Sequence, residues 1–225
     1  MNYKLYSFEE IPSTQEYAHE LIASGTATDR AVIIAGAQSA GRGRYRRTWI
    51  SKPGNLYASF IYKIEKREPR LSYAVAVAIA ETMISFGIDP KIKWPNDILI
   101  DGKKVSGTLI EYSKDFVIVG IGVNIKSNPV VAGYETTKLD RYKRGITRDK
   151  FLVALMDRLD EWAAHLSRGD FAPVRARWME LAAGLDSEIK YQGKPAILCE
   201  INPDGALVLR RGNDYILALG DEISI

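Results

Sequence analysis

The sequence predicts an α+β protein, in which a mixed β-sheet packs with helices and a small β-barrel follows. Up to Gly184, short apolar runs rich in β-branched residues alternate with longer segments of helical periodicity. Beyond Gly184, short strand-like runs follow one another closely and are separated by turn residues. This change, from alternating helical and strand-like segments to closely spaced strand-like runs, predicts a larger domain over residues 1–184 and a β module over residues 185–225.

The helices are predicted by apolar spacing and by signals at their ends. Ser13 and Thr14 are capping residues, and apolar residues recur on one face of the segment that follows them. The other helical segments have apolar spacing or are rich in alanine, and each stops at or near a glycine. The helices are expected at residues 15–22, 71–86, 147–168 and 173–183.

The strands are predicted by short apolar runs bounded by turn residues. Asp101-Gly102 lies between two such runs and predicts a tight hairpin turn. In the larger domain, strands are expected at residues 31–35, 55–62, 91–94, 98–100, 105–111 and 116–123. In the C-terminal module, they are expected at residues 189–191, 196–201, 206–209 and 216–219.

Composition and charge exclude several classes of protein. The 225 residues are 46% hydrophobic and 26% charged, as in a globular chain rather than a disordered one. The net charge of +3 is small for a dedicated nucleic-acid binder, which usually carries a large basic excess. The longest stretch without Asp, Glu, Lys or Arg covers residues 31–41, well short of the roughly 20 residues that span a bilayer.

The cysteine content and the first residues indicate the compartment. Cys199 is the single cysteine, so an internal disulfide is excluded and nothing demands an oxidising environment. One cysteine and two histidines do not supply a structural zinc site. The first residues lack the apolar core and cleavage site of a secretory signal. We therefore expect a cytoplasmic enzyme or binding protein that is not attached to a membrane.

A glycine- and arginine-rich loop is the first segment that could bind a ligand or take part in a reaction. Residues 41–49 read Gly-Arg-Gly-Arg-Tyr-Arg-Arg-Thr-Trp and follow a buried strand. Glycines let the backbone approach an anion, and arginines supply forked donors that suit phosphate or carboxylate. The alternative is a solvated basic loop on an RNA-binding surface, but four arginines beside two glycines favour an anion-binding loop. The loop has neither the ending of a Walker A motif nor the third glycine of a Rossmann fingerprint.

The second segment is Lys-Trp-Pro-Asn-Asp at residues 93–97. Pro95 keeps Trp94 out of helical geometry, and the amide of Asn96 and the carboxylate of Asp97 follow a strand end. These two side chains could hold a divalent cation or an attacking amine, or they could form an ordinary Asx turn. The residues alone do not decide between the two.

The third segment begins with Lys104, which lies at the start of an otherwise apolar strand. It is either a solvated edge charge, which is the commoner case, or a point charge aimed at a ligand. Gly107 weakens this strand unless something must approach its backbone.

The fourth segment alternates glycines with β-branched residues at positions 120–124. Gly120 and Gly122 leave one face of the strand bare, with room for a flat ligand, and the amide of Asn124 could read the edge of a base. A lone Gly-x-Gly is weak evidence on its own.

Taken in order and at these separations, the segments resemble the biotin protein ligase family over nearly the whole chain. Ser13-Thr14-Gln15 resembles the family's Ser-Thr-Asn, and residues 38–49 resemble its Gln-x-x-Gly-Arg-Gly-Arg-Arg-Gly-Arg-x-Trp loop. Residues 93–97 match Lys-Trp-Pro-Asn-Asp, and residues 104–111 and 120–124 fit Lys-x-x-Gly-Ile-Leu-x-Glu and Gly-x-Gly-x-Asn. The resemblance implies a biotin–lipoate ligase-like (class II synthetase) fold with an SH3-like C-terminal β-barrel.

Two positions depart from the family pattern. Gln15 replaces the usual asparagine and lengthens the amide side chain by one carbon. Tyr45 and Arg46 stand where the family commonly has arginine and glycine. Losing that glycine should restrict positive φ at this point of the loop.

The resemblance implies a reaction in two steps. Biotin and ATP, with Mg²⁺, first give biotinyl-5′-adenylate and pyrophosphate, because a carboxylate is a poor electrophile until it gains a good leaving group. A lysine of a biotin carboxyl carrier domain then takes the biotin as an amide.

The resemblance also implies roles for individual residues. The catalytic set is Lys104, Arg42, Arg44 and Asp97. The biotin-binding set is Ser13, Thr14, Gln15, Gln38, Arg42, Gly43, Arg44, Lys104, Gly107, Gly120 and Gly122. The ATP-binding set is Arg42, Arg44, Arg47, Trp49, Asn96, Lys104 and Asn124. Asn96 and Asp97 are the candidates for holding Mg²⁺.

The sequence leaves other functions and partners open beside this one. The nearest is a lipoate- or octanoate-protein ligase of the same superfamily, which typically lacks the Gly-Arg-Gly-Arg loop and the β appendage. A non-enzymatic RNA-binding protein leaves Lys-Trp-Pro-Asn-Asp unexplained. The motifs begin at Ser13 and leave no room for the helix-turn-helix of the repressor type, so no operator DNA is expected. Edge strands could pair two protomers as a homodimer or dock the carrier domain, and the sequence does not choose between them.

Overall fold

The structure is a computed structural model that describes residues 3–218 and 223–224. It forms two compact units, each built from two stretches of chain: residues 1–67 with 103–153, and residues 68–102 with 154–225. No described helix is long and apolar enough to cross a membrane.

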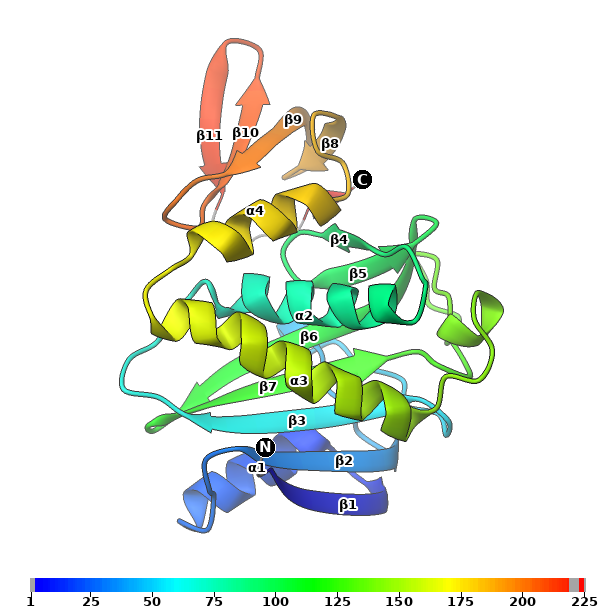
Figure 1. Cartoon of the computed structure of the whole chain (residues 1–225). Coiled ribbons are helices and arrows are strands. Elements are labelled where there is room, and N and C mark those ends of the chain that lie inside the picture. Colours follow the sequence, from blue (N-terminus) through cyan, green and yellow to red (C-terminus); the bar gives the residue numbers. More distant parts are fainter. Residues whose placement is uncertain (1–2, 219–222, 225) are drawn as a thin grey trace. The chain divides into compact units, whose positions relative to one another are not determined.

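The first unit is built on a mixed β-sheet. Its strands follow the order β1-β2-β3-β7-β6 (Figure 1). β1 is parallel to β2, whereas the other neighbours in this series are antiparallel. The strand bounds are β1 Lys4–Ile11, β2 Ala31–Gln38, β3 Leu56–Lys63, β6 Lys103–Ser113 and β7 Phe116–Val123. The predicted mixed sheet is therefore confirmed.

Helix α1 (Thr14–Ala23) packs against β2, β3 and β7 of this sheet. Ser13 caps the helix as predicted, because its side chain accepts a hydrogen bond from the backbone N–H of Glu16. The predicted apolar face lies inward: Leu21 and Ile22 are buried among residues that include Ile33 and Ile61 of the sheet. Burying such an aliphatic side chain contributes about 1.5–3 kcal/mol, so this face attaches α1 firmly to the sheet.

Strand β1 has no counterpart in the sequence prediction. Most of its side chains are exposed or half-buried, and Leu5 points outward with 55% of its surface exposed. β1 ends the strand order on this side, so only one neighbour covers it. Without a buried face there is no alternation of apolar and polar residues to mark a strand.

In the second unit, a second helix and a hairpin pack against an alanine-rich helix. Helix α2 (Leu71–Ser85) contacts α4 (Ala172–Leu181) and the antiparallel strands β4 (Lys91–Lys93) and β5 (Asp97–Ile100). Its residues 73–80 are all buried, which explains why small residues fill it. Helix α3 (Arg148–Ser167), which begins in the first unit and runs on in the second from Ala154, also forms as predicted, with the buried apolar residues Phe151, Leu152, Leu155, Leu159 and Leu166 at helical spacing.

The C-terminal module is an open antiparallel sheet in the described residues, which corrects the prediction of a closed barrel. Its strand order is β11-β10-β9-β8-β12, with β11 and β12 at opposite edges. On β11, Tyr215 and Leu217 keep 69% and 61% of their surface exposed, whereas barrel closure would pair this edge. The expected strand end at Leu219 lies outside the described residues. The bounds are β8 Glu188–Tyr191, β9 Lys194–Ile201, β10 Leu207–Arg211, β11 Asp214–Ala218 and β12 Ile223–Ser224.

A hydrogen-bond relay within the second unit joins the Lys-Trp-Pro-Asn-Asp segment to the C-terminal sheet. The buried Trp94 donates its Nε1 proton to the hydroxyl of Tyr73 over 3.0 Å. The Tyr73 hydroxyl in turn donates to the carbonyl oxygen of Gly205, in the turn before β10, over 2.7 Å. The hydroxyl of Tyr73 therefore satisfies two polar groups that belong to distant parts of the sequence.

Replacing Tyr73 by phenylalanine is expected to lower the free energy of unfolding by about 1–3 kcal/mol, because the Trp94 N–H stays buried without an acceptor. Urea unfolding measures the change. The matched control is Tyr215→Phe, which removes a hydroxyl from an exposed ring in the same unit and should shift stability by less than about 0.5 kcal/mol. Equal effects of the two substitutions would contradict the relay.

Candidate functional site

The arginine loop follows β2 and is closed by its own backbone. The N–H of Gly43 donates to the carbonyl of Arg47 over 2.8 Å, and the N–H of Trp49 donates to the carbonyl of Gly41 over 2.9 Å. Gly41 is required for this closure, because a Cβ there would lie 2.3 Å from the Trp49 carbonyl oxygen. The sequence thus folds this segment into a compact hairpin-like loop rather than an extended basic tail.

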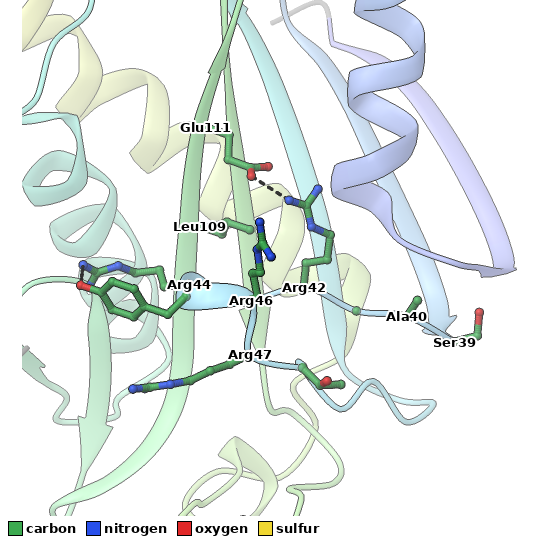
Figure 2. Close-up of a pocket in the computed structure, with 12 residues that line it drawn as sticks. Ser39, Ala40, Arg42, Arg44, Arg46, Arg47, Leu109 and Glu111 are labelled. Atoms are coloured by element: carbon green, nitrogen blue, oxygen red, sulfur yellow. Dashed lines mark hydrogen bonds and ion pairs between the residues drawn. The ribbon is translucent and has the colours of Figure 1, made fainter.

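The loop lines an open basic cavity of about 670 Å³. Residues 39–48 line it together with Leu109 and Glu111 of β6 (Figure 2). The lining includes four arginines, Arg42, Arg44, Arg46 and Arg47. Several guanidinium groups around one cavity suit a ligand that carries more than one negative charge.

The arginines of the loop do not all point the same way. Arg42 points toward Glu111, whereas Arg44 extends away from them (Figure 2). Arg44 donates from Nη2 to the Tyr45 hydroxyl over 3.1 Å, and its guanidinium lies 4.9 Å from the centroid of that ring. The guanidinium of Arg47 lies 5.7 Å from the same centroid. Tyr45, at a position where the family commonly has arginine, therefore holds two of the loop's arginines.

The backbone at this departure from the family pattern differs from the expectation. Tyr45 and Arg46 have φ values of 54° and 59°, in the left-handed region that should be restricted without glycine. Closure of the loop by the Gly43–Arg47 and Arg47–Arg44 hydrogen bonds demands this conformation despite the side chains. The loop thus keeps its turn and accepts local strain.

Replacing Arg46 by glycine is expected to raise the free energy of unfolding by about 0.5–1 kcal/mol, because relief of a left-handed φ outweighs the entropy of glycine in the unfolded chain. Denaturant unfolding measures the change. The matched control is Arg46→Ala, which removes the guanidinium but keeps the Cβ and its strain. If the alanine variant were stabilised as much, charge repulsion rather than backbone strain would be the cause.

A second group of site residues gathers around the indole of Trp49. Gly107 and Gly122 face each other on β6 and β7. A Cβ on Gly122 would lie 2.4 Å from the Trp49 ring, and one on Gly107 would lie 3.1 Å from it. The bare strand faces predicted for a flat ligand therefore accommodate the protein's own indole in this structure.

Lys104 belongs to this second group. Its Nζ lies 5.5 Å from the Trp49 ring centroid and 5.4 Å from that of Tyr134. It is not among the residues that line the basic cavity. The structure therefore places Lys104 beside Trp49 and Gly107, and not among the loop arginines that line the cavity.

The residues expected to bind the polar ring of biotin are brought together by hydrogen bonds. Thr14 donates from its backbone N–H and its hydroxyl to Oε1 of Gln38, over 2.8 and 3.1 Å. The Ser59 hydroxyl lies 2.9 Å from Thr14 Oγ1 and 3.0 Å from Gln15 Oε1. The Gln38 amide also donates to Ser51 over 2.8 Å. Sequence reasoning missed Ser51 and Ser59, which no motif marks.

Gly120 and Asn124 occupy different surroundings on and after β7. A Cβ on Gly120 would lie 2.5 Å from Gln15 Oε1, so Gly120 makes room for that amide. Asn124 is buried, and its Nδ2 donates to the carbonyl of Thr137 over 3.1 Å. Its Oδ1 is buried and accepts no hydrogen bond from the described residues. Such an acceptor is available for a ligand N–H.

Asn96 and Asp97 belong to the second unit: Asn96 lies in the turn before β5, and Asp97 is the first residue of that strand. Asp97 pairs with Lys93 across the β4–β5 hairpin, after a cis bond between Trp94 and Pro95. Both side chains are half-buried. Among the described residues, no three His, Cys, Asp or Glu side chains form a metal-binding group.

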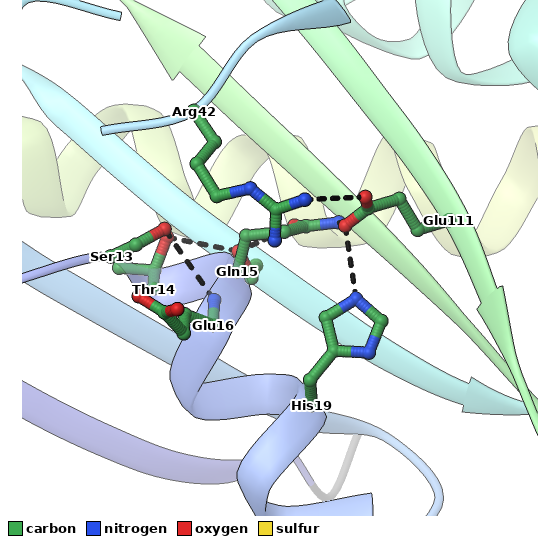
Figure 3. Close-up of polar contacts among 8 residues, drawn as sticks. Ser13, Thr14, Gln15, Glu16, His19, Arg42 and Glu111 are labelled. Atoms are coloured by element: carbon green, nitrogen blue, oxygen red, sulfur yellow. Dashed lines mark hydrogen bonds and ion pairs between the residues drawn. The ribbon is translucent and has the colours of Figure 1, made fainter. Parts of the chain in front are cut away.

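Glu111 is a site residue that the motif assignment left without a role. Its carboxylate accepts from Gln15 and from Arg42, each over 2.9 Å, and lies 3.0 Å from Nε2 of His19 (Figure 3). Burial raises the pKa of this carboxyl, but the bonds to His19 and Gln15 and the charge of Arg42 outweigh burial and leave the pKa below its ordinary value. Glu111 is therefore ionised at neutral pH.

This pKa predicts a stability change in acid. A carboxyl with a lower pKa in the folded state stabilises the protein above its unfolded-state pKa, and this contribution is lost as the pH falls through the folded-state pKa. Glu111→Gln should therefore flatten the decline of unfolding free energy between pH 6 and acid, measured by urea unfolding at several pH values. Glu161→Gln, which removes an exposed carboxylate of α3, is the matched control. An unchanged decline in Glu111→Gln would contradict the assignment.

The family model for the biotin/lipoate A/B protein ligase family matches residues 7–128. The bifunctional ligase/repressor BirA of Bacillus subtilis is 30% identical over 209 residues, which cover 84% of this chain and 63% of that protein. The biotin--[acetyl-CoA-carboxylase] ligase of Paracoccus denitrificans is 31% identical, covering 79% of this chain and 83% of the relative. The chain thus spans less than two thirds of the BirA relative's length.

A solved structure supports the same relationship. The biotin protein ligase from Aquifex aeolicus in complex with biotin and ATP matches with a TM-score of 0.88 and 26% identity, covering 98% of this chain and 97% of that one. The family model covers more than half of this chain, and the Paracoccus relative is matched over most of its length. The chain belongs to the biotin/lipoate A/B protein ligase family.

Proposed function

We propose that this protein is an ATP-dependent biotin protein ligase. The observation that carries the proposal is the cavity with four arginines, set on a fold that matches a biotin ligase bound to biotin and ATP over nearly its whole length. In the first step, a carboxylate oxygen of biotin attacks the α-phosphorus of ATP, and pyrophosphate leaves. In the second, a lysine amine attacks the acyl carbon, AMP leaves, and the amine loses its proton.

Two anions must meet in the first step, and the cationic residues serve this need. Arg42, Arg44 and Arg47, with the backbone of Gly43, hold the carboxylate and the phosphates. Lys104 stabilises the charge at the reacting carboxylate and α-phosphate. Fixed cations that face developing negative charge lower the barrier because they need no reorganisation during the reaction.

The hydrogen-bonded group around Thr14 suits the polar ring of biotin. Ser13, Thr14 and Gln15 are buried at the start of α1, and Gln38 bonds to Thr14. A buried ureido ring needs donors and acceptors on several sides, which hydroxyl and amide groups supply. Gly107, Gly120 and Gly122 complete the proposed biotin-binding set; for the bicycle to lie against Gly107 and Gly122, the Trp49 indole that lies there in this structure must move aside.

Two further residues suit adenine. Trp49 offers an aromatic face, and the buried Oδ1 of Asn124 offers an acceptor without a protein donor among the described residues. The exocyclic amine of adenine would satisfy it. Binding of ATP would therefore remove an unfavourable buried polar group.

Asn96 and Asp97 are proposed as the residues that hold Mg²⁺. They supply one amide and one carboxylate oxygen donor, which fits a cation that takes its remaining ligands from water and phosphate. Bound there, Mg²⁺ would neutralise charge on the phosphates of ATP. Asp97 is also proposed to orient the acceptor lysine or to take its proton.

The partners and the location are part of the same proposal. The acceptor is a biotin carboxyl carrier domain, and the chain binds no DNA. A homodimer and a cytoplasmic location are likewise predictions, as is a boundary between a catalytic domain over residues 1–184 and a C-terminal module over residues 185–225. Gel filtration tests the homodimer, and fluorescence anisotropy with duplex DNA tests the absence of DNA binding.

Calorimetric titration with biotin, and then with biotin in the presence of ATP, tests the proposed substrates. We expect binding in both cases, followed by transfer of radiolabelled biotin to a carrier domain. Binding and transfer of lipoate or octanoate instead would favour the other branch of the family. Salt-dependent affinity for RNA without either transfer would contradict the enzyme altogether.

A further inference from the structure

Three elements of the first unit converge on the carboxylate of Glu111. Gln15 and His19 come from α1, Arg42 comes from the arginine loop, and Glu111 itself stands on β6 (Figure 3). Oε2 takes the bonds of Gln15 and His19, while Oε1 takes the bond of Arg42. One side chain thereby links the helix that carries the proposed biotin-binding residues to the loop that carries the proposed anion-binding ones.

The link leaves Arg42 able to bind a further anion. It gives one N–H of Nη2 to Glu111, whereas a guanidinium has five N–H donors in a fixed plane. Arg42 also lines the basic cavity. A ligand anion can therefore bind Arg42 while the bond to Glu111 persists.

The surroundings explain why Arg42 needs an acidic partner. Four arginines lie among six consecutive residues of the loop, and like charges push such side chains apart. Among the described residues that line the cavity, Glu111 is the one carboxylate. Glu111 holds Arg42 by a hydrogen bond at the edge of the cavity. Arg44 and Arg47, in contrast, are held by contacts with the ring of Tyr45.

His19 and Gln15 hold Glu111 in turn. Both donate to the same oxygen from one face of α1, which directs the other oxygen to Arg42. Gln15, the residue that replaces the family's asparagine, bonds to Glu111 through Nε2 and turns Oε1 toward Ser59. The extra carbon of Gln15 thus has a structural use in this chain.

We propose that Glu111 is a positioning residue that orients Arg42 toward the reacting anions, and that His19 and Gln15 orient Glu111. The inference deepens the proposed biotin ligase function and rests on it. Loss of the carboxylate would slightly raise the positive potential of the cavity, but solvent and salt screen this effect. Loss of orientation dominates, because a misplaced guanidinium no longer matches the geometry of the bound anion.

The test uses added biotinyl-5′-adenylate, so that variants unable to synthesise it are still compared. Its dissociation rate is followed by tryptophan fluorescence, since Trp49 is part of the site. In the full-length protein, Glu111→Gln is expected to release the adenylate about tenfold faster, the effect of losing a charge-assisted hydrogen bond. His19→Gln, which keeps a donor near the same place, should release it less than about threefold faster, whereas His19→Ala should approach Glu111→Gln.

A double-mutant cycle with Arg42→Ala separates positioning from a structural role. If Glu111 acts through Arg42, Glu111→Gln changes the dissociation rate little once Arg42 is already absent. The same tenfold change in both backgrounds would overturn the inference, because Glu111 would then act by supporting α1 or β6. Glu161→Gln, which breaks the exposed pair with Arg158 on α3, is the control and should not change the rate.

Failure of the proposed function has a different signature. A wild-type protein that does not bind biotinyl-5′-adenylate at all would overturn the biotin ligase proposal, and this inference with it. A wild-type protein that binds it, with a Glu111→Gln variant that retains it equally well, would overturn the role of Glu111 alone.

Discussion

Replacing Lys104 by alanine is expected to abolish adenylate formation while the protein stays folded. Lys104 lies beside Trp49 and Tyr134, and its ammonium is the cation proposed to stabilise the carboxylate and the α-phosphate as they react. Removal of a positioned charge or donor that faces developing negative charge typically costs about 100- to 1,000-fold in rate. Pyrophosphate release in the presence of biotin and ATP measures the loss, and circular dichroism checks the fold.

Lys103→Ala is the matched control for this prediction. Lys103 is the residue before Lys104 on β6, so its side chain points to the opposite face of the strand, where Nζ pairs with Glu135 over 2.7 Å. We expect nearly normal pyrophosphate release from this variant. Normal release from Lys104→Ala, or an equal loss in Lys103→Ala, would remove Lys104 from its proposed role.

Gly122→Ala is expected to impair the site by displacing Trp49. The added Cβ would lie 2.4 Å from one atom of the indole and 2.6 Å from two others, far inside van der Waals contact. Because the backbone of Gly122 is paired with both β3 and β6, the indole and not the strand must move. We expect a destabilisation of about 1–3 kcal/mol, typical of overpacking, and an affinity for ATP reduced at least tenfold.

The cause of this effect can be isolated by removing the indole. The three nearest atoms to the added Cβ all belong to Trp49. In a Trp49→Ala background, Gly122→Ala should therefore cost less than about 0.5 kcal/mol of stability, because its clash has gone. An undiminished cost in that background would show that strand geometry, and not the contact with Trp49, makes glycine necessary.

Local sequence patterns predicted the parts of the fold that carry a local signal. The capped start of α1, the alanine-rich α2 and the amphipathic α3 were all marked by spacing, caps and terminal glycines, and all three form. β1 was missed because an edge strand with mostly exposed side chains has no buried face to create a pattern. The prediction that the C-terminal sheet closes into a barrel was wrong, because no short segment of sequence shows whether two edge strands pair with each other.

In the candidate site, too, the sequence predicted the residues that local motifs mark and missed the contacts between distant parts of the chain. Motif order led to Arg42, Lys104 and Gly122, whose residue types alone suggest anion or ring binding. The contacts of Glu111 with Gln15 and His19 join residues 96 and 92 positions apart, and no local rule anticipates them. They arise only when α1 packs on the sheet that contains β6.

The left-handed backbone at Tyr45 and Arg46 shows how tertiary context overrides a residue preference. Glycine is the residue expected at such φ values, and its replacement by arginine was expected to restrict positive φ here. The closing hydrogen bonds of the loop, together with the stacking of Arg44 and Arg47 on Tyr45, hold the turn regardless. A preference of about 1–2 kcal/mol is small enough for a few such contacts to offset.

The central claim is that biotin's carboxylate and the α-phosphate of ATP react in one site. Biotin-dependent exchange of radiolabelled pyrophosphate into ATP tests this claim most directly, because the exchange requires that reaction and its reversal and does not require an acceptor protein. We predict rapid exchange with biotin, none without an added acid, and none when lipoate replaces biotin. Exchange with lipoate but not with biotin, or no exchange with either acid in a folded protein, would contradict the account.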